Sequence, residues 1–137
     1  MRSALLLAMI CFASPAPAQD GKAALTIEVN AAQSVENGCN LSFLVENSLD
    51  SDIAGAVFET VIFNAEGQVA RMTLFDFGAL PAGRPRVRQF VLGGQGCDAI
   101  GRILFNGAQS CTGEGLTPAA CEAALKLQSR TNIEVAG

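Results

Sequence analysis

Histidine, tryptophan and tyrosine are all absent from the 137-residue sequence. Without histidine the chain lacks the usual general base near neutral pH and the commonest transition-metal ligand. Serine–histidine–aspartate triads, cysteine–histidine pairs and zinc or copper sites with histidine ligands are therefore excluded. Half of the residues are apolar and only 16% are charged, and a chain of this length supports one domain with a real hydrophobic core.

The amino-terminal segment has the layout of a secretory signal peptide. A single positive charge at Arg2 precedes an apolar run from Ala4 to Phe12, and a small-residue stretch ends at Ala18. The run is shorter than the roughly 20 residues that cross a bilayer as a helix, so we expect no stable membrane anchor. We expect residues 1–18 to be cleaved and residues 19–137 to form a single β-sandwich domain that is periplasmic or secreted.

Charge and cysteine content narrow the chemistry of this domain. Cleavage removes one of nine basic residues and none of 13 acidic ones, so eight basic side chains remain and the net charge is −5. An acidic domain has no electrostatic reason to bind nucleic acid, and we expect no cofactor and no metal site. The domain that remains after cleavage has four cysteines, Cys39, Cys97, Cys111 and Cys121. An even number of cysteines in a small exported domain predicts that they form two disulfides.

Short stretches rich in β-forming residues recur between clusters of glycine, proline, asparagine and aspartate, which predicts a mostly β fold. About seven strands suit an immunoglobulin-like antiparallel sandwich of two sheets. One short helix is expected from Thr117 to Leu125, because Thr117 can cap it and Pro118 fits its first position. The expected strands are Leu25 to Val29, Cys39 to Glu46, Ala54 to Phe63, Val69 to Phe77, Arg86 to Leu92, Ala99 to Asn106, and Leu125 to Val135 with an irregularity inside.

The run from Ala56 to Phe63, followed by Gly67 and then by the turn Leu80-Pro81-Ala82-Gly83, resembles immunoglobulin-like modules of small exported bacterial proteins. Those modules have a long strand, a hairpin and a Leu-Pro-x-Gly turn in this order. The sequence departs from the pattern because it lacks the core tryptophan and the tyrosine of the tyrosine corner. The resemblance implies an exported, periplasmic protein and assigns no functional residue.

Three disulfide pairings are possible for four cysteines. In an immunoglobulin-like order the second and sixth strands run in the same direction in facing sheets, which brings their starts, at Cys39 and Cys97, to the same end. Cys111 and Cys121 then close a local loop before the last strand. We therefore expect the pairs Cys39–Cys97 and Cys111–Cys121, the second of which holds the helix.

Three arginines concentrate positive charge on an otherwise acidic chain. Arg84, Arg86 and Arg88 lie two residues apart, a spacing that puts their side chains on one face of an extended strand. They form a candidate docking strip for an acidic partner, because guanidinium groups pair well with carboxylates. The alternative is an edge strand whose charges and proline discourage strand-on-strand aggregation.

The third and fourth strands are apolar on both faces, whereas a sandwich strand usually hides one face and exposes the other. Val57, Val61 and Phe63 lie on the face opposite Phe58 and Ile62. In the fourth strand, Phe75 and Phe77 oppose Met72 and Leu74. Either another segment covers the second face, with the insertion from Cys111 to Leu125 as the expected cover, or Val57, Val61 and Phe63 contribute to a partner-binding surface.

Three further features have simpler interpretations. Asn47, Asp50 and Asp52 supply oxygen atoms but lack the spacing of a calcium loop, so an Asx-type turn is expected. Asp76 is expected to face solvent. The stretch from Gly93 to Gly96 is expected to be a turn without a helix to bind phosphate.

These features predict an exported, disulfide-stabilised interaction or accessory module for another cell-envelope protein, and not an enzyme. The first alternative is a structural subunit of a surface or fibre assembly, because such subunits are also small exported sandwiches with exposed strand edges. The second alternative is an enzyme that uses only aspartate, glutamate, arginine or serine.

Overall fold

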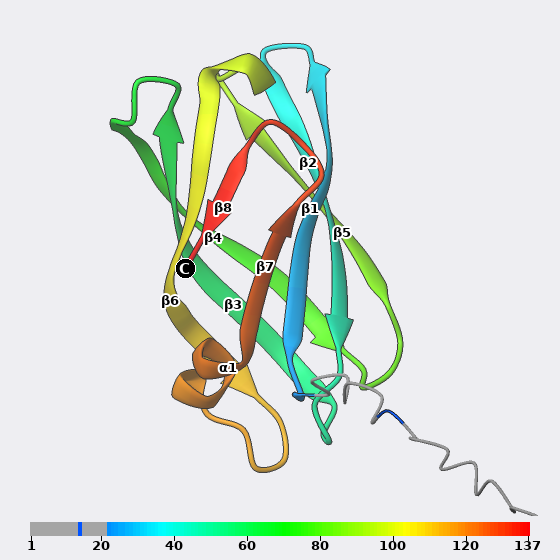
Figure 1. The fold of residues 1–137 in the computed structure, drawn as a ribbon. Coiled ribbons are helices and arrows are strands. Elements are labelled where there is room, and N and C mark those ends of the chain that lie inside the picture. Colours follow the sequence, from blue (N-terminus) through cyan, green and yellow to red (C-terminus); the bar gives the residue numbers. More distant parts are fainter. Residues whose placement is uncertain (1–13, 15–21) are drawn as a thin grey trace, which may run out of the picture.

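A computed structural model describes Ser14 and residues 22–137. The expected signal peptide, apart from Ser14, and its cleavage point after Ala18 lie outside the described residues. Within residues 22–137, eight strands and one α-helix follow in the order β1 to β6, α1, β7 and β8 (Figure 1). Their bounds are β1 Leu25–Val35, β2 Gly38–Asn47, β3 Ile53–Asn64, β4 Val69–Leu80, β5 Arg86–Gly93, β6 Ile100–Thr112, α1 Pro118–Ala124, β7 Leu125–Ser129 and β8 Glu134–Ala136, with a 3₁₀ turn at Cys97–Ala99 before β6.

The strands form two four-stranded sheets that face each other, which confirms a mostly β sandwich. Sheet A has the order β5-β2-β1-β7, and sheet B has the order β4-β3-β6-β8. All pairs are antiparallel except the last strand of each sheet, since β7 runs parallel to β1 and β8 runs parallel to β6. The strands β4 and β5 therefore form one open side of the sandwich, and β7 and β8 form the other.

The single last strand expected from Leu125 to Val135 is wrong, because the structure divides it between the two sheets. The chain turns at residues 130–133, where the Ser129 hydroxyl accepts a hydrogen bond from the backbone N–H of Thr131. The N–H of Arg130 donates to the carbonyl of Val29, which ends the parallel pairing with β1. Through this turn the chain passes from sheet A to sheet B, where β8 pairs with β6.

Apolar side chains that alternate along each strand fill the space between the sheets. Phe43 of β2 lies at the centre, with its ring centroid 5.5 Å from those of Phe75 and Phe77 and 6.5 Å from that of Phe105. Phe90 of β5 stacks on Phe75 with the centroids 4.4 Å apart. Edge-to-face and stacked phenylalanines therefore replace the tryptophan that such sandwiches often use in the core.

Both predicted disulfides and the predicted helix cap are present. Cys39 pairs with Cys97, and Cys111 pairs with Cys121. The first bridge joins β2 of sheet A to the turn before β6 of sheet B, and the second fixes α1 to the end of β6. The Thr117 hydroxyl accepts a hydrogen bond from the N–H of Ala120 at 3.1 Å, so this residue caps α1 as expected.

Candidate functional site

The outer face of sheet B is apolar around the middle of β3. Phe58 and Ile62 point into the core and are fully buried, so the residues that alternate with them, Val57, Val61 and Phe63, point outward as predicted. Val61 lies opposite Met72 of β4 on one side and Leu104 of β6 on the other. Directly opposite residues share a face of the sheet, so these three side chains form one row.

Neighbouring positions extend this row into a continuous surface. Phe63 lies opposite Val69, and Leu74 lies opposite Glu59, one step along the same face. Val57 faces outward as well, but it lies opposite the polar residues Asp76 and Ser110. We define the sheet B patch as the six apolar residues Val61, Phe63, Val69, Met72, Leu74 and Leu104.

The sheet B patch is open on the β4 side. Met72 and Val69 are each 60% exposed and Leu74 is 49% exposed, whereas Val61 is only 6% exposed because its neighbours flank it. The expected cover from the Cys111 to Leu125 insertion is wrong. The Cys111–Cys121 bridge and a bond from the N–H of Ala108 to Glu122 Oε1, 2.6 Å long, hold α1 against β6. The helix therefore leaves the outer surface of β4 uncovered.

Two polar pairs flank the sheet B patch on the side away from the β4 edge. The guanidinium of Arg102 lies 5.9 Å from the ring centroid of Phe63 and forms an ion pair with Glu134 at 3.0 Å. Asn106 donates a 2.6 Å hydrogen bond to Glu59. The patch thus has an apolar centre and a polar margin in which donors and acceptors are already paired.

Val69 and Leu104 were not among the candidate site residues predicted from the sequence. A usable signal exists for Leu104, because Ile103, Leu104 and Phe105 form an unbroken apolar triplet, and an alternating strand with one wet face would interrupt it. Val69 follows the hairpin turn and reaches the outer face through a register shift between Ile62 and Phe63, which no local pattern reveals.

The three arginines of the candidate docking strip are not equivalent. Arg84 precedes β5, while Arg86 and Arg88 share the inner face of that strand with Phe90. Arg88 Nε donates to the carbonyl of Phe77 at 2.7 Å, and its Nη2 donates to the carbonyl of Ala79 at 2.9 Å. Arg88 therefore bridges β5 of sheet A to β4 of sheet B, whereas Arg84 and Arg86 form no ion pair with the described residues.

A second arginine bridges the same open side at its other end. Arg71 of β4 donates through Nη2 to the carbonyl of Gly93 at the end of β5. The pair Arg71 and Arg88 thus connects two edge strands that share no backbone ladder. No local sequence pattern predicts this role for Arg71, because its partner is 22 residues away.

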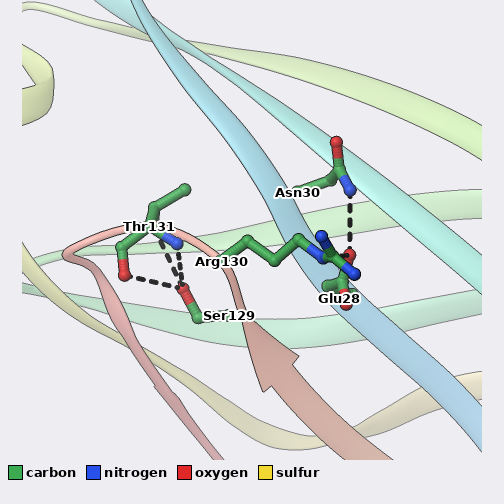
Figure 2. Close-up of polar contacts among 5 residues, drawn as sticks. All are labelled: Glu28, Asn30, Ser129, Arg130 and Thr131. Atoms are coloured by element: carbon green, nitrogen blue, oxygen red, sulfur yellow. Dashed lines mark hydrogen bonds and ion pairs between the residues drawn. The ribbon is translucent and has the colours of Figure 1, made fainter.

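The outer face of sheet A is mainly polar. Glu28 of β1 accepts a 2.8 Å hydrogen bond from Asn30 and forms an ion pair with Arg130 at 3.2 Å (Figure 2). Gln89 donates to the hydroxyl of Ser42 at 2.9 Å. Exposed apolar side chains occur on this face at the edge strand β5, where Val87 is 59% and Val91 is 64% exposed.

The remaining candidates have structural roles. The Asn47 side chain accepts from the N–H of Leu49 and donates to the carbonyls of Ser51 and Leu80, so it organises the expected Asx turn. Within the part of the chain that the structure describes, no three potential metal ligands cluster. Asp76 is exposed, as expected, and accepts from the N–H of Gly78.

The turn from Gly93 to Gly96 leads into the short 3₁₀ turn Cys97–Ala99, which the sequence analysis did not expect.

No protein-family model and no curated protein sequence matches the chain. Its structure is similar to that of IrmA from Escherichia coli, with a TM-score of 0.62 and 11% sequence identity. The match covers 77% of this chain and 92% of IrmA. At this identity the likeness concerns the fold alone, and it places the chain beside a small β-rich bacterial protein.

Two disulfides indicate an oxidising compartment outside the cytoplasm. Among the residues that the structure describes, no helix has the length and apolar character needed to span a bilayer.

Proposed function

We propose that this protein is an exported interaction module and that it binds another protein of the cell envelope through the sheet B patch. The observation that carries the proposal is the exposure of Val69, Met72 and Leu74 around the buried Val61. A sandwich sheet with one wet face does not need large apolar residues there. Exposed apolar surface rimmed by polar residues is typical of protein-binding sites.

The margin of the patch supports a protein partner. Interfaces between proteins have an apolar centre in which charges are sparse and a polar rim that stays in contact with water. The Arg102–Glu134 ion pair and the Glu59–Asn106 hydrogen bond lie at this rim with their polar atoms paired. A partner can cover the centre of the patch without leaving these groups buried and unpaired.

Export to the periplasm or the medium is the second part of the proposal. It is supported by the signal-peptide layout of residues 1–18 and by the two disulfides. The finer description of the fold as immunoglobulin-like belongs to the same proposal. It is supported by the pairing of β1 with β2 in one sheet and of β3 with β6 in the other.

Photo-crosslinking in the producing cell tests the proposed surface. A photoreactive phenylalanine analogue replaces Met72 in one protein and Gln128, on the outer face of sheet A, in the control. We expect a crosslink to a different envelope protein from the Met72 position only. The double variant Met72→Ser and Leu74→Ser should lose capture of that partner, and Thr26→Ser with Gln128→Ser should keep it.

Two outcomes contradict the proposal. Crosslinks between copies of this chain, together with polymers in gel filtration, would favour the structural subunit of an assembly. Equal crosslinking from the Met72 and Gln128 positions would show that the sheet B patch has no special role.

A further inference from the structure

The edge of β5 that faces away from β2 has unpaired backbone groups at its centre. The N–H of Gly94 donates to the carbonyl of Asn37, one register step beyond the pair Gly38 and Gly93. Hydrogen-bonded pairs alternate along an antiparallel ladder. By this alternation, the backbone groups that bond to β2 are those of Arg86, Arg88, Phe90 and Leu92. The N–H and C=O groups of the residues between and after them point to the free edge; these residues are Val87, Gln89, Val91 and Gly93.

Two independent contacts confirm this parity and limit the open stretch. Arg88 Nη1 donates to the carbonyl of Val87 at 3.1 Å, and Arg71 donates to the carbonyl of Gly93, so both carbonyls lie outside the ladder. Between these capped ends, Gln89 and Val91 each present one N–H and one C=O. The edge therefore offers two complete hydrogen-bonding positions, enough for a short added strand of about five residues.

Side chains beside this edge specify the chemistry of an added strand. Val87 and Val91 are the two most exposed large apolar residues of sheet A, and they lie on its outer face on either side of Gln89. Arg84 and Arg86 at the start of β5 have no carboxylate partner among the described residues, in a protein with an excess of acidic residues. A strand with apolar residues at alternate positions and carboxylates at one end complements both features.

We propose that the free edge of β5 binds an extended acidic segment of a partner protein as an antiparallel added strand. Its apolar side chains lie beside Val87 and Val91, and its carboxylates lie next to Arg84 and Arg86. In antiparallel order the acidic residues are at the carboxyl end of the segment, because that end meets the start of β5. This surface is separate from the sheet B patch, so the proposal does not rest on the function proposed above.

The register predicts which peptide N–H groups are needed. Residues opposite Gln89 and Val91 in hydrogen-bonded pairs share the outer face with them. In a fluorescent peptide of sequence Val-Thr-Val-Thr-Val-Asp-Glu-Asp, the valines are therefore the residues that exchange hydrogen bonds with β5. Methylation of the valine nitrogens should reduce affinity at least about tenfold, and methylation of the threonine nitrogens should change it less than about threefold.

Matched protein variants test the same edge from the other side. Gln89→Pro removes an N–H that points away from β2, which an edge strand tolerates, and Gln89→Ala controls for the lost bond to Ser42. Binding of the fluorescent peptide should fall at least about tenfold in the proline variant only. The double variant Arg84→Ser and Arg86→Ser should weaken binding about five- to tenfold at low salt, and Lys126→Ser on β7 should not.

Fluorescence anisotropy of the full domain with intact disulfides measures each affinity. An equal loss of affinity with both methylated peptides would indicate side-chain docking instead of strand addition and would overturn the proposal. Absence of binding at roughly millimolar peptide would overturn it as well. A peptide-free dimer that Gln89→Pro dissociates would show that a second copy occupies the edge, which also overturns it. Failure here leaves the Met72 crosslink unaffected, and the Met72→Ser and Leu74→Ser variant should still bind the peptide.

Discussion

The two outer faces of the sandwich differ in the polarity of the side chains that they expose to water. On sheet A, Asn30 and Arg130 each pair with the carboxylate of Glu28, and Gln89 donates a hydrogen bond to Ser42. On sheet B, the corresponding central row is Met72, Val61 and Leu104. Both sheets have four strands and both place alternating apolar residues in the shared core, so the fold does not require this difference.

The difference separates residues that build the fold from residues available for binding. Removal of Phe43 or Phe58 would open the core, whereas exposed residues such as Met72 contribute little to packing. An apolar face that the fold does not use is consistent with the proposed contact outside the domain. The comparison therefore supports the proposal that the outer face of sheet B binds a partner, whereas on sheet A the proposed binding is confined to the free edge of β5.

The largest expected effect comes from a charge placed at the centre of each face. Val61→Asp puts an unpaired carboxylate at a position that is 6% exposed and should lower the free energy of unfolding by roughly 2–4 kcal/mol. Val61→Ala, which removes only apolar area, should cost roughly 1–2 kcal/mol. Ser42→Asp on sheet A should cost less than about 1 kcal/mol. Urea unfolding measures all three, and equal losses for the two aspartate variants would contradict the contrast between the faces.

The next effect concerns the open side formed by β4 and β5, where Arg88 connects the two sheets. Arg88→Ala leaves the carbonyls of Phe77 and Ala79 without their donor and should cost roughly 1–3 kcal/mol. Arg86→Ala, two residues earlier on the same face of β5, should change stability by less than about 0.5 kcal/mol. Thermal unfolding under non-reducing conditions compares them. An unchanged melting temperature for Arg88→Ala would mean that the sheets do not depend on this bridge.

A smaller effect compares the apolar residues of the sheet B patch with the two exposed valines of β5 in sheet A. Met72→Thr with Leu74→Thr should alter stability by less than about 0.5 kcal/mol and reduce the fluorescence of a bound hydrophobic dye. Val87→Thr with Val91→Thr should reduce the dye signal less, because Gln89 separates these valines. A larger decrease in dye fluorescence for the Val87 and Val91 variant would show that the main exposed apolar surface is on sheet A.

The smallest effect is expected from the polar pairing on sheet A. Arg130 is 73% exposed at its side chain, so its ion pair with Glu28 is strongly screened. Arg130→Ala should change the free energy of unfolding by less than about 0.5 kcal/mol, and the difference should vanish in about 1 M salt. A loss above about 1 kcal/mol would make this pairing part of the fold's stability.

Local patterns predicted most of the fold. Alternation identified the two-sided character of β3, and Thr117 followed by Pro118 located the start of α1. The disulfide pairs followed from the positions of Cys39 and Cys97 at the starts of facing strands. The observed strands are longer than expected, since β1 continues to Val35 and β6 to Thr112, because pairing with neighbours extends segments whose own β propensity is weak.

Contacts between distant segments set the limit of the sequence analysis. The bonds from Arg88 to the β4 carbonyls depend on how two sheets cross, and three evenly spaced arginines do not reveal which one is engaged. The insertion after Cys111 was expected over the outer face, but the anchoring of α1 through Glu122 is tertiary. For the candidate site, the sequence indicated Val57, Val61 and Phe63, together with Met72 and Leu74 of the fourth strand. The register added Val69 and Leu104.

The parallel pairing of β7 with β1 and of β8 with β6 affects the order of events when the protein is made. Residues 125–136 supply the final strand of both sheets. Synthesis proceeds from the amino end, so neither sheet is complete until this stretch has left the ribosome. Pairing across such long sequence separations also folds slowly. Both sheets therefore become complete only when residues 125–136 are available to pair with β1 and β6.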